Sequence, residues 1–264
     1  FLEFELDMWY FRLVEKGWEK FARQVKQEKG KISKAIAKQL SGLSVTEVMA
    51  EDVIQKEGFP EDIMKWDASI LRRFAVTLRK LTKPMVIACN KIDVGSGMAN
   101  LEKLKKEFPN HMLIACSAEA ELALREAAKH ELIGYVPGEN NFEILKAEKL
   151  NEKQKQALAF IRKNILEKDG STGVQQVVDT AVFDLLKYSA IFPGGVNKLE
   201  DSEGRRLPDV FLMPPKSTAL DFAFRLHTDL GKNFIRAIDV RTKRVVGKEY
   251  LLKNRDVIEI VSGK

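Results

Sequence analysis

The sequence is poor in cysteine and histidine and contains no long hydrophobic run. Two cysteines among 264 residues cannot form the disulfide framework of a small secreted protein, so a reducing, cytoplasmic setting is expected. The three histidines, His111, His130 and His227, are not joined by carboxylates or cysteines at the spacing of a zinc site, so no metal site is predicted. No apolar run approaches the ~18 residues of a membrane-spanning helix, and no membrane contact is expected.

A phosphate-binding loop is also missing. Neither Gly95–Met98 (G-S-G-M) nor Gly170–Gly173 (G-S-T-G) has the spacing or the lysine of the pattern G-x-x-x-x-G-K-[ST]. The chain begins at Phe1 with F-L-E-F-E-L-D-M-W-Y, which is more typical of the middle of an element than of a natural start. We therefore expect that a portion preceding Phe1 is absent from this sequence.

The composition is that of a folded protein with a basic excess. A chain of 264 residues, 45% of them hydrophobic, is long enough for about two domains and excludes wholesale disorder. The net charge is +6, and residues 209–264 hold eleven Lys and Arg against seven Asp and Glu. Such an excess favours a polyanionic partner such as RNA, although ordinary solvated lysines produce the same imbalance, and both explanations stay open.

Residues 1–58 are predicted to be a helical insertion. Gly30 and Gly42 are expected to separate its helices. A helical hairpin packed on the main domain is favoured over a partner-binding arm. The apolar residues that recur at three- and four-residue steps are Trp18, Phe21, Val25, Ile32, Ile36 and Leu40.

Residues 59–190 alternate between helical and strand patterns. An amphipathic helix over 67–81 is followed by a strand at 85–89, a helix at 101–108 and a strand at 111–116. Short, nearly continuous apolar strands joined by helices are typical of a parallel sheet covered on both faces. Ligands of such sheets bind at the carboxyl ends of the strands.

After a turn-rich linker at 191–207, the pattern changes to that of a small α+β module over 208–264. Strands are predicted at 209–213, 233–240 and 256–261, and Ser217-Thr218 can cap a helix that runs to Leu226.

Both strands of the parallel pair end in polar motifs. Asn90-Lys91-Ile92-Asp93 follows the first strand, and Ser117-Ala118 follows the second. A fixed Asp93 carboxylate can accept the ring N–H and the exocyclic amino group of guanine, a donor pair that adenine lacks. Asn90 can reach the base or tie the two loops together, the Lys91 stem can cover the ring, and the Ala118 N–H can meet the guanine carbonyl. The alternative is two ordinary turns between strand and loop.

These motifs resemble the guanine-recognition motifs of translation-factor-like P-loop GTPases. The segments L-P-D-V-F-L-M-P-P-K-S-T-A-L-D-F-A-F-R-L-H-T-D-L-G, F-I-R-A-I-D-V and L-K-N-R-D-V-I-E-I-V resemble a TGS domain, which has a β-grasp fold. With the opening F-L-E-F-E-L-D-M-W and A-I-F-P-G-G-V, nearly the whole chain is similar to the Obg-related YchF-type GTPases, closest to their archaeal branch.

This resemblance implies an α/β fold in which residues 59–190 are the C-terminal part of a P-loop GTPase-type parallel sheet, incomplete here, and residues 208–264 are a TGS-like β-grasp domain. It also implies GTP as the ligand, Mg²⁺ with it, slow GTP hydrolysis in the intact protein and a role around the ribosome. A non-enzymatic adaptor that binds RNA or ribosomes is the alternative. The intact N-K-I-D favours GTP, while Lys216 and Arg255 stand where the TGS pattern favours glycine.

The other residues with possible functional roles are expected to serve the structure of the protein. Cys89 and Cys116 each end an apolar strand and are expected to be buried thiols, with a redox pair as the alternative. For His227 two roles stay open, helix capping and contact with RNA. The phenylalanines Phe222, Phe224 and Phe234 are expected in the core, with base stacking as the alternative.

Overall fold

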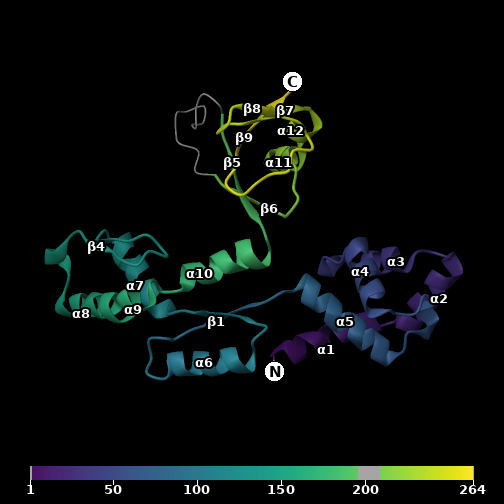
Figure 1. The fold of residues 1–264 in the computed structure, drawn as a ribbon, viewed down its shortest axis with the longest axis horizontal. Helices are drawn as coiled ribbons and strands as arrows, with labels where there is room; N and C mark the ends of the chain where they lie inside the picture. Colours follow the sequence, from purple (N-terminus) through teal and green to yellow (C-terminus); the bar gives the residue numbers. More distant parts are fainter. Residues whose placement is uncertain (1, 196–208, 264) are drawn as a thin grey trace. The chain divides into compact units, whose positions relative to one another are not determined.

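The computed structural model describes residues 2–195 and 209–263 (Figure 1), and the chain divides into two compact units. The first unit comprises residues 1–84 and the second comprises residues 85–264. Each unit has hydrophobic clusters of its own, so each is described separately.

The first unit is entirely helical. Gly30 lies between its second and third helices, and Gly42 lies in a short 3-10 turn, as the sequence predicts. The elements are α1 (Leu2–Glu15), α2 (Trp18–Glu28), α3 (Ile32–Gln39), η1 (Ser41–Leu43), α4 (Glu47–Glu57), η2 (Ile63–Lys65) and α5 (Ala68–Thr82).

The helical unit extends further than the predicted boundary at residue 58. Helix α5 packs on α1 and α4 and buries Leu71, Phe74 and Leu78 in the same core as the preceding helices. The helix begins where predicted, because the Asp67 carboxylate accepts a hydrogen bond from the Ile70 N–H at 2.9 Å and caps it. The amphipathic pattern over 67–81 therefore predicts the helix, but its apolar face completes the helical unit.

Aromatic rings fill the centre of this core. The indole rings of Trp18 and Trp66 stack with centroids 5.4 Å apart, and Phe59 and Phe74 pack against Trp66. All three tryptophans of the chain, Trp9 among them, lie in the helical unit. Tryptophan fluorescence is therefore a probe of this unit.

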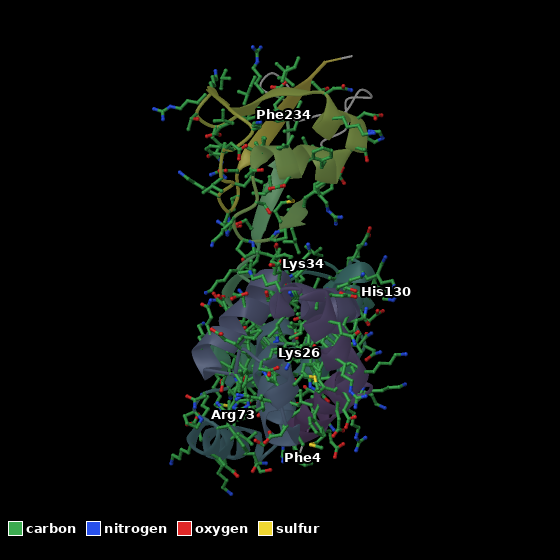
Figure 2. The ribbon with its side chains drawn as sticks, turned by 90° about the vertical axis from the view of Figure 1, so that its right-hand side faces the viewer. Phe4, Lys26, Lys34, Arg73, His130 and Phe234 are labelled. Atoms are coloured by element: carbon green, nitrogen blue, oxygen red, sulfur yellow. The ribbon has the colours of Figure 1, made fainter. Side chains whose placement is uncertain are left out.

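Ion pairs join the helices at the surface. Lys26 and Arg73 are both labelled in Figure 2. The Lys26 ammonium lies 3.0 Å from the Asp62 carboxylate. The Arg73 guanidinium lies 2.8 Å from the Glu57 carboxylate and 5.2 Å from the centre of the Phe59 ring. Exposed pairs of this kind contribute little to stability, about 0–1 kcal/mol each.

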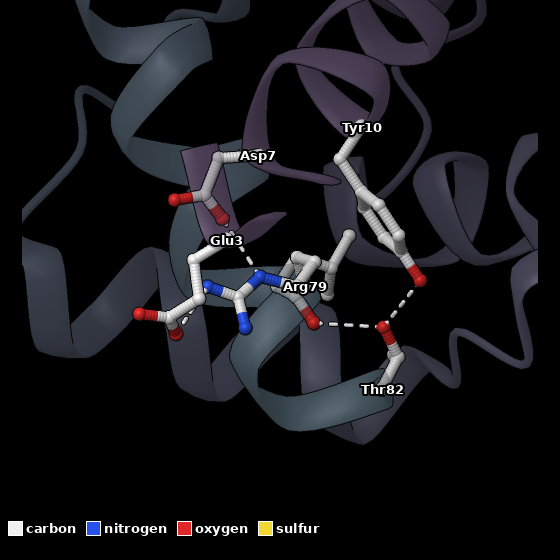
Figure 3. A network of polar contacts seen from close by, with 6 residues as sticks. Glu3, Asp7, Tyr10, Arg79 and Thr82 are labelled. Carbon is white, nitrogen blue, oxygen red and sulfur yellow. Dashed lines mark hydrogen bonds and ion pairs between the residues drawn. The ribbon is translucent and has the colours of Figure 1, made fainter. Parts of the chain in front are cut away.

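A buried arginine joins α5 to α1 (Figure 3). The Arg79 side chain is only 3% exposed, and its Nε donates to the Asp7 carboxylate at 2.7 Å. Its second contact is with Glu3, at 3.3 Å. One turn further, the Tyr10 and Thr82 hydroxyls lie 2.7 Å apart. Because a buried guanidinium without a carboxylate partner is costly, this arginine fixes how α5 lies on α1.

The second unit begins with the predicted strand–helix–strand segment. Strand β1 (Val86–Cys89) pairs with β2 (Met112–Ala115) in parallel, with helix α6 (Gly97–Glu107) between them in sequence. The parallel pairing confirms the prediction. The strands are not covered on both faces by the described elements, since Ile87 and Met112 remain more than one third exposed.

The middle of the second unit is mainly helical. Its elements are α7 (Ala118–Lys129), β3 (Ile133–Gly134), β4 (Glu143–Ile144), η3 (Ala147–Lys149), α8 (Glu152–Ile161), η4 (Arg162–Leu166), α9 (Glu167–Asp169), α10 (Val174–Asp179) and η5 (Thr180–Leu185). The strands β3 and β4 form a short antiparallel pair, and η4 and η5 are π-helical turns.

The chain then forms a five-stranded sheet with the strand order β6-β5-β9-β7-β8. The elements are β5 (Ser189–Pro193), β6 (Phe211–Met213), α11 (Ala219–Leu226), α12 (Thr228–Lys232), β7 (Phe234–Asp239), β8 (Arg244–Val246) and β9 (Val257–Ser262). The predicted linker at 191–207 overlaps β5, because Ile191 is fully buried in the core of this sheet. Residues 196–208, which include the rest of that linker and the predicted boundary at 208, lie outside the described residues.

Local details of this module agree with its sequence. Thr218 caps α11 in a capping box with Asp221. Lys216 and Arg255, which replace glycines of the TGS pattern, adopt φ of 66° and 69° and so keep the left-handed backbone that glycine would favour.

The structure shows which phenylalanines of this module are in the core and which role His227 has. Phe222 is fully buried and Phe234 packs against the core, but Phe224 is 45% exposed and its assignment to the core is wrong. The His227 Nδ1 accepts the Asp229 N–H at 3.2 Å, which is the capping alternative.

No helix within residues 2–195 and 209–263 is both long enough and apolar enough to cross a bilayer.

We predict that Asp7→Ala lowers the free energy of unfolding of the helical unit by about 3 kcal/mol, because Arg79 stays buried with only Glu3 beside it. Urea unfolding followed by tryptophan fluorescence measures this effect. The matched control is Glu5→Ala in the same helix, which removes an exposed carboxylate and should change stability by less than about 0.5 kcal/mol. Equal midpoints for the two variants would show that the buried contact is not stabilising.

Candidate base-recognition site

The two polar motifs meet at the carboxyl edge of the parallel strands. Cys89 and Ala115 are partners at the last position of the register, so both following loops start at the same edge. The Cys116 N–H donates to the Cys89 carbonyl at 3.0 Å, and the Ile92 N–H donates to the Cys116 carbonyl at 3.3 Å. All five predicted residues, Asn90, Lys91, Asp93, Ser117 and Ala118, therefore belong to one pair of adjoining loops.

The Asn90 side chain joins the two loops. Its Oδ1 accepts the Lys91 N–H at 2.8 Å and the Ala118 N–H at 2.9 Å. Of the two roles left open by the sequence, this contact is the loop tie. Lys91, whose N–H makes the first of these bonds, adopts the left-handed conformation with φ of 67°. Because the Ala118 N–H is engaged here, its contact with a guanine carbonyl stays a prediction that requires Asn90 to share or release it.

Asp93 and Lys91 are both exposed. Within the described parts of the chain, the Asp93 carboxylate has no hydrogen bond or ion pair, so both of its oxygens are available to a ligand. Ser117 is the opposite case, since it is 1% exposed and its Oγ has no hydrogen-bond partner among the described residues. An unpaired buried hydroxyl in one loop and an available carboxylate in the adjoining loop fit a site that a polar ligand completes.

The cysteines behind these loops are unreactive by environment. Burial raises the pKa of the Cys116 thiol, and it also raises the pKa of the half-buried Cys89 thiol. Both groups therefore remain protonated at neutral pH, which favours structural thiols over a redox pair. No group of three or more His, Cys, Asp and Glu side chains that could hold a metal ion occurs in residues 2–195 or 209–263.

A third segment, the turn Gly170–Gly173, supports the Ser117-Ala118 loop through its backbone. The Thr172 carbonyl accepts the Ser117 N–H at 2.8 Å. Gly173 has φ of 76°, and a Cβ at this position would lie 1.9 Å from the Ala115 carbonyl oxygen, so only glycine lets the two backbones approach. In the sequence this turn is noted only as a segment without the spacing or the lysine of a phosphate-binding loop, and its glycine pair is the signal that could have marked a close approach.

A buried carboxylate that the sequence does not reveal accepts a hydrogen bond from this turn. Glu121 in α7 is 3% exposed and accepts hydrogen bonds from the Thr172 hydroxyl at 2.6 Å, the Tyr135 hydroxyl at 2.7 Å and the Arg125 Nε at 2.6 Å. Burial by itself would raise the pKa of Glu121, but the hydrogen bonds from Thr172, Arg125 and Tyr135 outweigh it and lower that pKa below its usual value. Burial and the bond to Glu121 raise the pKa of Tyr135 to about 12. Glu121 is thus an ionised acceptor held among donors.

We predict that Gly173→Ala destabilises this loop far more than Gly170→Ala does. Gly170 has the same left-handed backbone, with φ of 79°, but open space where a Cβ would be. Its substitution should cost about 1 kcal/mol from backbone strain alone. At Gly173 the collision with the Ala115 carbonyl adds about 1–3 kcal/mol. Amide hydrogen exchange at Ser117 measures the difference, and equal exchange in both variants would contradict the close approach.

Comparison with known proteins agrees with this geometry. Residues 88–195 match the family described as Obg-like GTPase YGR210-like, G4 motif-containing domain, and residues 203–262 match the TGS domain. A GTP-binding protein of Methanocaldococcus jannaschii is 44% identical over 99% of this chain and 65% of its own length. A GTP-binding protein of Schizosaccharomyces pombe is 28% identical over 72% of this chain and 47% of its own length.

A solved structure extends the likeness to the fold. The crystal structure of a GTP-binding protein from Pyrococcus horikoshii OT3 matches with a TM-score of 0.78 and 41% identity, over 100% of this chain and 70% of that one. The chain therefore spans about two thirds of the length of its archaeal relatives. The expected fold class, an α/β GTPase-type sheet followed by a β-grasp TGS domain, is confirmed. The chain belongs to the family of Obg-like GTPases and carries a TGS domain.

Proposed function

We propose that the intact protein binds GTP and that this chain reads the guanine base. The observation that carries the proposal is the meeting of an available Asp93 carboxylate with the Asn90–Ala118 loop tie at one edge of a parallel sheet. The relatives from Methanocaldococcus jannaschii and Pyrococcus horikoshii are named GTP-binding proteins, which supports the same ligand.

Each residue has a distinct role in this proposal. The two Asp93 oxygens accept the ring N–H and the exocyclic amino group of guanine, a charge-assisted pair of bonds. Asn90 sets the distance between the two loops, and the Lys91 stem covers one face of the ring. The buried Ser117 hydroxyl is a further polar group beside the base, and the Ala118 N–H is shared between Asn90 Oδ1 and the guanine carbonyl oxygen.

We further propose that GTP hydrolysis in the intact protein is slow. Bound with GTP, Mg²⁺ would neutralise charge on the phosphates. The residues assigned above address the base only, so this chain contributes binding and orientation. The alternative is a non-enzymatic adaptor that retains the GTPase fold and binds RNA or ribosomes without turnover. Phosphate release from GTP and Mg²⁺ by the intact protein distinguishes the two.

We predict that Asp93→Asn weakens GTP binding by about fivefold or more, because the loss of a paired base contact costs ~1–3 kcal/mol. The same variant should gain affinity for xanthosine triphosphate, whose edge presents an acceptor to the new amide. Competition of both nucleotides against fluorescent GDP on the intact protein measures the change.

The control for this experiment is Glu119→Gln, an exposed residue in the first turn of α7 that loses the same charge. It should leave the preference for GTP over xanthosine triphosphate intact. If Asp93→Asn also keeps that preference, the carboxylate does not read the base.

We also propose that the partner is the ribosome or a structured RNA, bound through the basic C-terminal module. The turn between β7 and β8, strand β8 and the residues just after it carry four exposed cationic side chains that make no ion pair within the described parts of the chain. These residues are Arg241, Lys243, Arg244 and Lys248. Cations of this kind contact phosphates and displace counterions.

A second basic surface has to be tested against the first. Residues 16–38, which span α2 and α3, hold eight Lys and Arg against two Asp and Glu. Lys26 and Lys31 of this region are paired with carboxylates, but Lys34, labelled in Figure 2, and Lys38 are not paired within the described residues. Charge reversal on each surface in turn therefore distinguishes the two.

We predict that Lys243→Glu with Lys248→Glu weakens ribosome binding at least about tenfold and flattens its salt dependence, because two phosphate contacts are lost. Lys34→Glu with Lys38→Glu changes the net charge equally and should have less than about a twofold effect. Co-sedimentation with ribosomes at two salt concentrations compares them.

Charge reversal is preferable to removal of residues 209–264, since that deletion takes both neighbours, β6 and β9, from β5. A larger effect of the α3 pair would move the contact to the helical unit. Equal effects of the two double variants would indicate a non-specific attraction between the protein and the ribosome. Either result overturns the assignment of the contact to the C-terminal module.

A further inference from the structure

We propose that Thr172 is a positioning residue for guanine selectivity, anchored by the buried carboxylate of Glu121. The inference rests on the proposed binding of GTP and adds to it a residue that lies far along the chain from both base motifs. Thr172 is fully buried, so its effect on the base is indirect.

Three successive hydrogen bonds connect Glu121 to the base-reading loop. The Thr172 hydroxyl donates to Glu121 Oε2 at 2.6 Å, across 51 residues of sequence. The Thr172 carbonyl accepts the Ser117 N–H at 2.8 Å. The next N–H, that of Ala118, donates to Asn90 Oδ1 at 2.9 Å. The position of Thr172 therefore sets where the Ser117-Ala118 turn stands relative to Asn90.

The ionised state of Glu121 makes this anchor strong. A buried carboxylate is costly unless donors surround it, and here three donors do so. Charge-assisted bonds are shorter and about twice as strong as bonds between neutral groups. Glu121 lies in the first turn of α7, the helix that begins at Ala118, so the anchor and the base-reading turn belong to one rigid segment.

The same carboxylate offers a matched control. Tyr135 donates to the same Oε2 as Thr172, at 2.7 Å, but neither its side chain nor its backbone bonds to Ser117 or Ala118. Removal of either hydroxyl takes one bond from Glu121. The Tyr135 hydroxyl also contacts the Thr172 side chain, but only removal of the Thr172 hydroxyl takes the Glu121 anchor from the residue whose carbonyl holds the Ser117 N–H.

The experiment compares Thr172→Val, which keeps the shape and removes the hydroxyl, with Thr172→Ser, which restores it, and with Tyr135→Phe. The first readout needs no nucleotide: amide exchange at Ser117 should accelerate in Thr172→Val alone. The second is the ratio of GTP to ATP affinity in the intact protein. It should fall about fivefold to tenfold in Thr172→Val, the worth of one lost hydrogen bond, and less than twofold in Thr172→Ser and Tyr135→Phe.

The outcomes separate this inference from the function on which it rests. If the unaltered protein prefers GTP and Thr172→Val keeps that preference, or if Tyr135→Phe loses it equally, Thr172 has no positioning role. If the unaltered protein has no preference for GTP, the proposed function fails and takes this inference with it. Should Thr172→Val not fold, Glu121→Asp withdraws the carboxylate from Thr172 while keeping its charge, and the same change in ratio is expected.

Discussion

The hydrogen bond from the Ala118 N–H to Asn90 Oδ1 is the contact on which the candidate site depends. It joins two loops that are 28 residues apart in sequence, and it does so with a side chain. A bond of this kind contributes only about 1 kcal/mol by itself. It can specify a geometry because the parallel pairing of β1 and β2 has already brought both loops to the same edge.

The support under that contact is made of backbone as much as of side chains. Gly173 lets one main chain touch another, and the Thr172 carbonyl takes up an N–H that the loop would otherwise leave unpaired. Glu121 then holds Thr172 through the side-chain hydroxyl of that residue. These contacts hold the backbone on which the exposed residues Asp93 and Lys91 stand, although the side chains of these two residues make no hydrogen bond or ion pair among the described residues.

Local patterns in the sequence predict local structure well. Asp67 caps α5, Thr218 caps α11 and the two apolar runs pair in parallel, since each of these features depends on neighbouring residues or on burial of a continuous run. The five candidate base-site residues lie on adjoining loops for the same reason: strand ends can be located from the sequence. Phe224 was misassigned because its aromatic side chain alone does not tell which face of α11 it occupies.

What the sequence does not reveal is contact between distant segments. An acidic residue in an amphipathic helix, such as Glu121, is usually solvated, and nothing within α7 shows that Thr172 and Tyr135 come to it. Likewise, β5 lies in a stretch of turn residues and becomes a strand only because β6 and β9 flank it. The helical unit passes the predicted boundary at 58 because the apolar face of α5 finds its partners in α1 and α4.

Lysine and arginine hold left-handed positions at several turns, among them Lys91, Lys216 and Arg255. Each such residue carries a strain of roughly 1–2 kcal/mol that glycine would avoid. In return, a residue with a Cβ has fewer conformations to regain when the chain unfolds, and this saving is entropic. Strain changes little with temperature, whereas an entropic saving grows in proportion to it. The turns of this protein thus become relatively more favourable, compared with glycine turns, as the temperature rises.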